Sequence, residues 1–268
     1  MKRIDYPHIG ETVYAGTLPN GLPIRVITKP GYRRRFAVFA TNYGGADRRF
    51  SLGGQAIDTP AGVAHYLEHK MFDMPEGDAL MTLNAAGASP NAFTSEAMTA
   101  YHFECTDRFE ENLETLLRFV STPYFTQASV DKERGIIAQE IRMYEDNPDF
   151  LVYEQLMRSL FRYSPLRDTV AGTVESIQDI TPDVLYSCHK VFYHPSNMAL
   201  CVVGDVDPEA VERIAGTLLT PERAELPGRD YGPEETLLPE EALCEKQMDV
   251  AAPLFMLGAK LGPVTTGP

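Results

Sequence analysis

The most informative part of this 268-residue sequence is the pentapeptide His65-Tyr66-Leu67-Glu68-His69. It follows Thr59-Pro60, a pair typical of a helix start, because threonine can cap the first turn and proline fits the first helical position. On a helix with 3.6 residues per turn, His65 and His69 lie one turn apart, and Glu68 falls within the same arc of ~100°. The two imidazoles and the carboxylate therefore point to the same side of the predicted helix 61–72.

Two imidazoles four residues apart on a helix are a natural pair of zinc ligands. The carboxylate one residue before the second histidine can reach a metal-activated water rather than the metal itself, which is the inverted form of the H-E-x-x-H arrangement. With 6 histidines in the chain, a shuffled sequence of this composition would contain the pattern roughly 0.01 times. The alternative is an ordinary helix whose two histidines make hydrogen bonds.

A catalytic zinc site needs a third protein ligand, with the fourth position left to water. The predicted helix 130–146, which Ser129 would cap, carries Glu133 and Glu140 close to two full turns apart, so both project from one face. We assign Glu140 as the third ligand and Glu133 as an outer carboxylate that orients ligands or water. Helical periodicity alone does not choose between the two, and two solvent-exposed glutamates are the ordinary alternative.

Strand and helix patterns mix along the chain without the regular βαβ repeat of a parallel sheet. Asn20-Gly21 predicts a tight hairpin turn between two short strands. Apolar or alternating runs predict strands at 12–14, 22–27, 36–40, 99–106 and 198–203, and helical spacing predicts helices at 61–72, 108–121, 130–146, 150–162, 182–193 and 207–219. This order favours an α+β fold with a mixed, largely antiparallel sheet packed with helices.

Composition and charge limit the partners of the chain. Lys and Arg number 24 against 38 Asp and Glu, a net charge of -14 that repels phosphate backbones and anionic lipid, so we expect neither nucleic acid nor a membrane as partner. The four cysteines show no C-x-x-C pair, which suits reduced thiols. No apolar run approaches the ~20 residues of a membrane span, and no apolar segment follows the basic N-terminus as in a secretory signal. We therefore expect a cytoplasmic location.

The sequence changes character after about residue 220. Residues 221–245 are punctuated by prolines and hold eight acidic residues against two arginines, which is typical of a linker. Beyond them, 248–258 predicts one more apolar strand, and a lone strand cannot bury both of its faces. We therefore expect a catalytic domain at 1–220, an acidic proline-rich linker at 221–245, and the start of a truncated second domain at 246–268.

Four segments resemble, in order, the active half of the pitrilysin/insulinase-type zinc peptidases, the inverzincins with an H-x-x-E-H motif. They are His65-Tyr66-Leu67-Glu68-His69, Asn91-Ala92-Phe93-Thr94, the run from Lys132 to Ile141, and His194-Pro195-Ser196-Asn197-Met198. The resemblance covers about residues 10–260 and is closest to bacterial cytosolic members that are similar to processing peptidases. Four ordered motifs are far more specific than one.

The resemblance implies a role for each matching residue of the predicted metal centre. Zinc would bind His65, His69 and Glu140. Glu68 would act as the general base, and Glu133 would be a neighbouring carboxylate that supports catalysis. The truncated second domain at 246–268 would then be homologous to the first.

The segment 91–94 would form an edge strand that pairs with an extended peptide substrate through main-chain hydrogen bonds. Asn91, Ala92, Phe93 and Thr94 are therefore the expected substrate-binding residues. Without the resemblance, an ordinary hairpin strand is the favoured interpretation of this segment.

Together these residues predict a zinc-dependent endopeptidase that hydrolyses extended peptides, with metal-activated water and Glu68 as general base. In the resembled family a second homologous half encloses the substrate and supplies an arginine and a tyrosine that hold the reacting carbonyl, and no counterpart is visible here. Because loss of one such donor costs ~10²–10³ in rate, we expect this chain alone to be weakly active or inactive, and to work with a second half or a partner subunit.

Two alternatives belong to other functional classes. One is a non-catalytic scaffold, or a subunit of a heteromeric processing complex, with the same fold, because a fold does not decide activity. The other is a zinc hydrolase that acts on a small non-peptide molecule, which a deep closed pocket beside the metal would favour.

Overall fold

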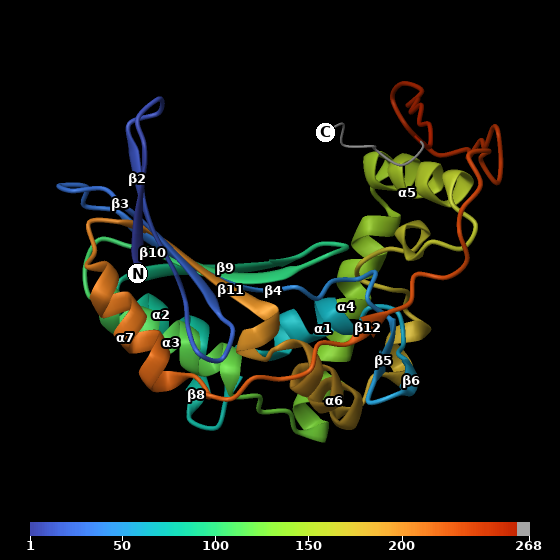
Figure 1. The fold of residues 1–268 in the computed structure, drawn as a ribbon. Coiled ribbons are helices and arrows are strands. Elements are labelled where there is room, and N and C mark those ends of the chain that lie inside the picture. The colour runs from blue at the N-terminus through green and yellow to red at the C-terminus, as the bar shows by residue number, and fades with distance from the viewer. Residues whose placement is uncertain (262–268) are drawn as a thin grey trace.

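A seven-stranded sheet forms the centre of the computed structural model, which describes residues 1–261 (Figure 1). In spatial order its strands are β1 (Lys2–Tyr6), β2 (Glu11–Thr17), β3 (Pro23–Thr28), β11 (Met198–Gly204), β4 (Arg35–Thr41), β10 (Thr99–Cys105) and β9 (Ala88–Thr94). Every neighbouring pair is antiparallel except β11 and β3, which are parallel. The predicted α+β fold with a mixed, largely antiparallel sheet is confirmed.

Most of the helices cover one face of the sheet, on its lower side in Figure 1, whereas the helix Pro148–Leu160 lies at one end of the molecule, beyond the sheet. The helices are α1 (Val63–Lys70), α2 (Ala79–Ala85), α3 (Phe109–Ser121), α4 (Gln127–Glu145), α5 (Pro148–Leu160), α6 (Pro182–Phe192) and α7 (Pro208–Leu218), with short 3-10 turns at Pro165–Arg167, Ser176–Asp179 and Pro195–Asn197. On α3 the predicted stripe of Leu113, Leu116, Leu117 and Val120 is fully buried. It packs with inward-facing side chains of β4 and β10, such as Phe39. This apolar layer fixes where α1 and α4 lie.

Small strands complete the fold at the margins of this layer. A three-stranded sheet joins β12 (Gly228–Arg229), β5 (Arg49–Leu52) and β6 (Gln55–Asp58), and a two-stranded ribbon joins β7 (Asp73–Met74) and β8 (Gly77–Asp78). No helix in residues 1–261 combines the length and the apolar character that a membrane crossing requires.

Two helix starts differ from the sequence prediction. Helix α1 begins at Val63 rather than after Thr59, because Gly62 has a φ of 96°, which is not helical. A side chain there is also excluded, since a Cβ would lie 2.6 Å from the carbonyl oxygen of Ala171. Helix α4 is capped by Thr126 rather than Ser129, and the Ser129 hydroxyl instead completes a reciprocal capping box with the backbone of Thr126.

The last part of the described chain crosses the α5 end of the molecule without regular structure (Figure 1). The predicted strand at 248–258 is wrong: residues 246–261 form no strand, because no neighbouring strand offers them hydrogen bonds. Gly258 instead lies close against Leu156 and Leu160 of α5. The rest of the predicted second domain, 262–268, lies outside the described residues, and the three domain boundaries stay predictions.

One buried histidine makes the stability of the fold depend on pH. The ring of His189 on α6 is 7% exposed, donates Nε2–H to the carbonyl of Val120 at 3.0 Å and stacks on Tyr193. Burial lowers the pKa of His189 from 6.5 to about 4. Because the unfolded state then binds the proton more readily, this contribution to stability is complete above pH 6.5 and is lost as the pH falls towards 4.

We expect the free energy of unfolding to be about 2 kcal/mol lower at pH 5 than at pH 7 through His189 alone. Urea unfolding of the wild type and of His189→Gln at both pH values measures this contribution. The variant should lose less stability between pH 7 and pH 5 than the wild type. Equal losses in the two proteins would contradict the assignment.

Candidate metal centre

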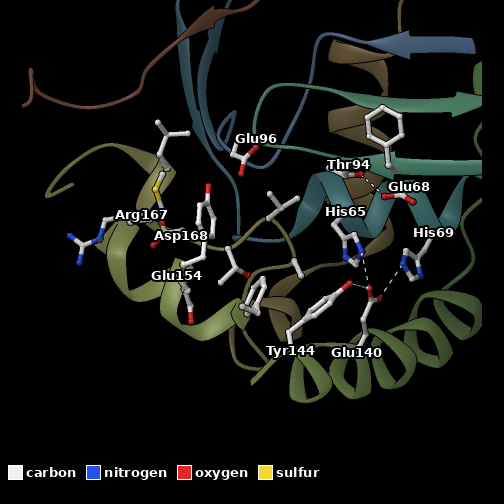
Figure 2. Close-up of a pocket in the computed structure, with 18 of the residues that line it drawn as sticks. His65, Glu68, His69, Thr94, Glu96, Glu140, Tyr144, Glu154, Arg167 and Asp168 are labelled. Atoms are coloured by element: carbon white, nitrogen blue, oxygen red, sulfur yellow. Dashed lines mark hydrogen bonds and ion pairs between the residues drawn. The ribbon is translucent and has the colours of Figure 1, made fainter. Parts of the chain in front are cut away.

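The two helices that carry the predicted metal ligands face each other (Figure 2). His65 Nε2 lies 3.6 Å from one carboxylate oxygen of Glu140, and His69 Nε2 lies 3.5 Å from the other. One ligand atom from each of these three residues lies within 4.8 Å of the others. The structure therefore brings the three residues proposed from the sequence into one cluster.

Apolar packing on the opposite sides of both helices orients this cluster. On α1, Tyr66 and Leu67 are fully buried in the core, and on α4 Ile137 is fully buried. The Tyr66 hydroxyl also donates to the carbonyl of Val130, which ties α1 to α4. His65 and His69 on α1 and Glu140 on α4 are consequently held on the sides of the two helices that face away from the core.

The cluster has the donors and the spacing that suit a zinc ion. The distances of 3.5 and 3.6 Å from the imidazole nitrogens to the carboxylate oxygens of Glu140 are too long for good hydrogen bonds. They are close to the ~3.3 Å between ligand atoms that bonds of 2.0–2.1 Å give in a tetrahedron. His65 also has a buried Nδ1 without a partner in the described part of the chain. Two imidazoles and a carboxylate thus fit the zinc that the resemblance implies.

Glu133 lies beside the cluster rather than in it. Its Oε1 is 2.9 Å from Nδ1 of His69. An Nδ1–H donated to Glu133 leaves the lone pair of Nε2 facing Glu140, which is the orientation a metal-ligating histidine needs. Burial is the largest single effect and opposes charge on both groups. The hydrogen bond and the attraction of nearby opposite charges together outweigh it, so the pKa of His69 is raised and the pKa of Glu133 is lowered.

Replacing Glu133 by glutamine should weaken metal binding without abolishing it. Glutamine can still accept the Nδ1–H of His69, but it lacks the charge that strengthens that hydrogen bond. Changes to such partners of ligands typically cost 10–100-fold in metal affinity or activity, so we expect a zinc dissociation constant about tenfold higher. Competition with a chelating dye measures it. An affinity equal to that of the wild type would contradict the role of Glu133.

Glu68 stands next to the cluster and receives a hydrogen bond that the sequence did not predict. The hydroxyl of Thr94, the last residue of β9, donates to Oε2 of Glu68 at 2.6 Å (Figure 2). Burial raises the pKa of Glu68, and the Thr94 hydrogen bond only partly opposes this effect. A carboxyl with a raised pKa is better matched to proton transfer near neutral pH.

A second unpredicted contact holds Glu140. The hydroxyl of Tyr144, one turn further along α4, donates to Oε1 of Glu140 at 2.7 Å. This hydrogen bond raises the pKa of Tyr144 to about 12. The spacing of four residues was visible in the sequence, but a tyrosine at that distance is also common on ordinary amphipathic helices.

The predicted substrate strand lies at the edge of the main sheet. Asn91, Ala92, Phe93 and Thr94 belong to β9, which pairs with β10 on one side and with no strand on its other side among residues 1–261. The side chain of Phe93 is largely exposed, and Asn91 folds its side chain back onto the amide of Ala92. Ala92, Phe93 and Thr94 line the cavity next to the metal ligands, whereas Asn91 does not.

This cavity has a volume of about 370 Å³ and reaches from the metal centre to α5. Its apolar wall is formed by Phe150, Tyr153 and Met157 of α5 together with Leu166. It is open to solvent, and Ala92, Phe93 and Thr94 of β9 form part of its lining. An open cavity next to an edge strand suits an extended chain better than a small enclosed molecule.

The H-x-x-E-H motif on α1 is that of the inverzincin class of metallopeptidases. The model of the family described as Insulinase (Peptidase family M16) matches residues 53–174, and the model described as Peptidase M16 inactive domain matches residues 179–266. The chain belongs to the M16, or insulinase, family of peptidases.

Several relatives share most of this chain. It is 44% identical to the uncharacterized zinc protease YmfH of Bacillus subtilis over 266 residues, which are 97% of this chain and 62% of the relative. It is 29% identical over 209 residues to the probable beta subunit of the mitochondrial-processing peptidase of Arabidopsis thaliana, covering 76% of this chain and 38% of that protein. The chain thus spans about half the length of the relatives it matches.

Two solved structures have a fold similar to that of this chain. The putative M16-like peptidase of Alicyclobacillus acidocaldarius superimposes with a TM-score of 0.82 at 38% identity, over 89% of this chain and 56% of that one. The ferredoxin protease FusC, solved as a mutant in complex with Arabidopsis ferredoxin, gives a TM-score of 0.72 at 26% identity over 82% of this chain and 25% of that one.

Proposed function

We propose that this chain carries the active centre of a zinc-dependent endopeptidase that hydrolyses extended peptides. The observation that carries the proposal is the cluster of His65, His69 and Glu140, with ligand atoms within 4.8 Å of one another, beside the carboxylate of Glu68. Zinc is the proposed ion, since two imidazoles and one carboxylate are a frequent ligand set for catalytic zinc. The relatives named as zinc proteases support the same choice.

Zinc at this cluster would polarise the scissile carbonyl and lower the pKa of a bound water towards ~7. The remaining steps belong to residues of the chain. Glu68 accepts the proton of the attacking water and returns it to the leaving amine. Thr94 holds one oxygen of Glu68 and leaves the other free for this transfer. Glu133 fixes the ring of His69, and Tyr144 fixes the carboxylate of Glu140.

The open edge of β9 supports an extended peptide as the substrate. A peptide added there would form main-chain hydrogen bonds along residues 91–94, beside the metal centre. Such pairing reads backbone shape more than side chains, so a range of sequences would be accepted. The cavity wall on α5 would take an apolar side chain of the substrate.

A second half or partner subunit belongs to the proposal. Several apolar side chains beyond residue 236 are at least 65% exposed, namely Leu237, Leu238, Leu243, Phe255, Leu257 and Leu261. Large apolar side chains exposed repeatedly along one segment are typical of a surface that a protein partner covers. We therefore propose a catalytic domain at 1–220, a connecting segment at 221–245 and the start of a homologous domain from 246. Without that partner, the chain would have weak activity.

The second candidate function is that of a non-catalytic scaffold or subunit in a heteromeric processing complex. It is favoured by a relative named as a processing-peptidase subunit and by the exposed apolar side chains beyond residue 236. A cytoplasmic location is part of the first proposal and is supported by four cysteines without disulfides, of which Cys105 and Cys188 are buried.

An internally quenched peptide incubated with the zinc-loaded chain separates the candidates. Cleavage that stops on chelation and returns with zinc supports the peptidase. If no peptide from a diverse mixture is cut at millimolar substrate, even when the proposed second half or partner subunit is supplied, the non-catalytic role is correct.

A further inference from the structure

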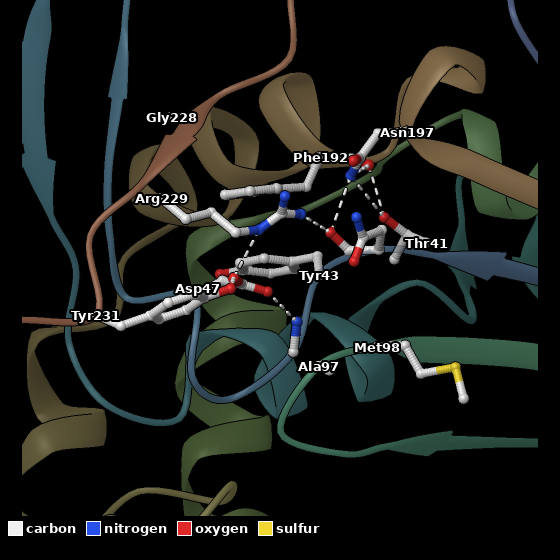
Figure 3. A network of polar contacts seen from close by, with 12 residues as sticks. Thr41, Tyr43, Asp47, Ala97, Met98, Phe192, Asn197, Gly228, Arg229 and Tyr231 are labelled. Atoms are coloured by element: carbon white, nitrogen blue, oxygen red, sulfur yellow. Dashed lines mark hydrogen bonds and ion pairs between the residues drawn. The ribbon is translucent and has the colours of Figure 1, made fainter. Parts of the chain in front are cut away.

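A buried carboxylate outside the metal centre joins two distant parts of the chain (Figure 3). The side chain of Asp47 is only 2% exposed. Its Oδ2 accepts the backbone N–H of Gly44 at 2.9 Å, and its Oδ1 accepts Nε–H of Arg229 at 2.8 Å and the hydroxyl of Tyr231 at 2.9 Å. Asp47 therefore joins the turn at 44–47 to Arg229 and Tyr231, which lie more than 180 positions later in the chain.

Residues 228–231, which we call the strap, lie in the segment predicted to be a linker. The first two residues of the strap form β12, which pairs with β5, with Gly228 opposite Ser51 and Arg229 opposite Phe50. Arg229 also donates to the carbonyl of Asn42, and its guanidinium lies 6.0 Å from the centre of the Phe192 ring. With its side chain 19% exposed, Arg229 is held from several directions rather than lying free in solvent.

The turn that Asp47 fixes is in direct contact with the turn between β9 and β10. The N–H of Gly45 donates to the carbonyl of Ser95, and the N–H of Ala46 donates to the carbonyl of Glu96, each at 2.9 Å. Gly44 packs so closely that a Cβ there would lie 2.5 Å from the carbonyl of Glu96. A shift of the first turn must therefore move the second.

The second turn begins directly after Thr94, whose hydroxyl holds Glu68 at 2.6 Å. Thr99, fully buried at the other end of the turn, lies with its hydroxyl 3.3 Å from that of Thr94 and 3.0 Å from the carbonyl of Tyr43. The contacts thus run without a gap from the strap, through two turns, to the carboxylate proposed as the general base.

We propose that Arg229 and Tyr231 are positioning residues for the general base, acting through Asp47 and the two turns on Thr94 and Glu68. This inference rests on the proposed peptidase function. It gives the acidic segment after residue 220 a role in catalysis, because the strap holds the end of β9 against the metal centre. The metal ligands lie on α1 and α4 and make none of these contacts, so we expect changes in the strap to leave zinc binding intact.

The first measurement follows backbone motion and needs no activity. In zinc-loaded protein, Arg229→Gln removes the charge that faces Asp47, and Tyr231→Phe removes one hydroxyl with little risk to folding. We expect amide hydrogen exchange in 42–48 and 94–99 to become roughly tenfold faster in Arg229→Gln. A smaller increase is expected in Tyr231→Phe. Unchanged exchange in both segments would overturn the proposal.

Glu235→Gln is the matched control, because it weakens another anchor of the same segment. Glu235 accepts the backbone N–H groups of Arg162 and Ser164 at 2.9 and 2.8 Å and pairs with Lys260, and none of these partners belongs to the turns at 44–47 and 95–98. Exchange at those turns should stay as in the wild type. Equal acceleration in this control would show general loosening of the segment and would overturn the specific role of the strap.

The second measurement separates positioning from binding. In Arg229→Gln and Thr94→Val we expect kcat to fall roughly tenfold or more, since small displacements of reacting groups are costly. KM and zinc content should change less than about twofold, because only transition-state interactions are lost. Thr94→Ser, which keeps the hydroxyl, should restore kcat. A loss confined to KM, or no rescue by serine, would overturn the proposal.

The two measurements also distinguish failure of this inference from failure of the proposed function. If the wild-type protein cleaves no peptide, the peptidase proposal fails, and hydrogen exchange alone still tests the coupling between the strap and β9. If the wild type cleaves peptide but Arg229→Gln does so with unchanged kcat, only the inference fails.

Discussion

Glu68→Gln should remove nearly all peptide hydrolysis and leave the metal centre intact. Glutamine has almost the same shape as glutamate, but it cannot accept a proton at neutral pH. The Thr94 hydroxyl can still donate to its amide oxygen, so neighbouring side chains need not move. Since a positioned general base contributes 10²–10⁴-fold, we expect kcat on an internally quenched peptide to fall about 10³-fold.

Zinc content and thermal unfolding of Glu68→Gln should match those of the wild type, because Glu68 is not one of the three clustered ligands. Glu96→Gln is the matched control: it removes one negative charge from the same cavity. Its kcat should stay within about threefold of the wild type, since this carboxylate has no proton to transfer. A Glu68→Gln protein that is fully loaded with zinc and cuts at the wild-type rate would disprove the mechanism.

The sequence allowed the local part of this site to be predicted, because helical geometry is set within a few residues. The spacing of His65, Glu68 and His69 required all three side chains on one side of α1, and α1 has them there. The start of that helix was misplaced by two residues, since Gly62 has a φ of 96° and packs too closely against Ala171 to carry a side chain, and neither feature is visible in the sequence. The direction of a side chain on a helix depends on the helical repeat alone, whereas the residue at which the helix starts depends on tertiary packing.

The choice between Glu133 and Glu140 could not be made from periodicity. Both carboxylates project from the same face of α4, and the crossing of α1 over α4 decides which one lies between the imidazoles. The order of motifs in the resembled family supplied that information. In the structure Glu140 lies 3.6 and 3.5 Å from the two imidazoles, whereas Glu133 contacts only Nδ1 of His69.

Hydrogen bonds between residues far apart in the chain could not be predicted from the sequence. Thr94 was expected to bind substrate, and nothing in its neighbourhood pointed to a hydrogen bond with Glu68. Arg229 and Tyr231 stood in an acidic, proline-rich stretch that is typical of linkers, yet they reach a buried Asp47. Composition describes the average behaviour of a segment and does not reveal single residues that anchor it.

His65→Ala should lose both zinc and turnover, which separates it from Glu68→Gln. One of the three clustered ligands disappears, and only His69 and Glu140 of that cluster remain to hold a metal. Burial lowers the pKa of His65 to about 4, so in the wild type the imidazole is neutral at pH 7 and can bind a metal without first releasing a proton. The loss therefore reflects the missing ligand rather than a change in protonation.

Metal analysis after dialysis should find about one zinc per wild-type chain and less than roughly a tenth of that in His65→Ala. His8→Ala removes an exposed histidine from the turn between β1 and β2 and should retain zinc, which excludes adventitious binding to any imidazole. Because zinc bound only to the folded state adds to stability, added zinc should raise the melting temperature of the wild type and of His8→Ala but not that of His65→Ala. Zinc retained by His65→Ala at one ion per chain would place the metal elsewhere, and the proposed chemistry of Glu68 would lose its basis.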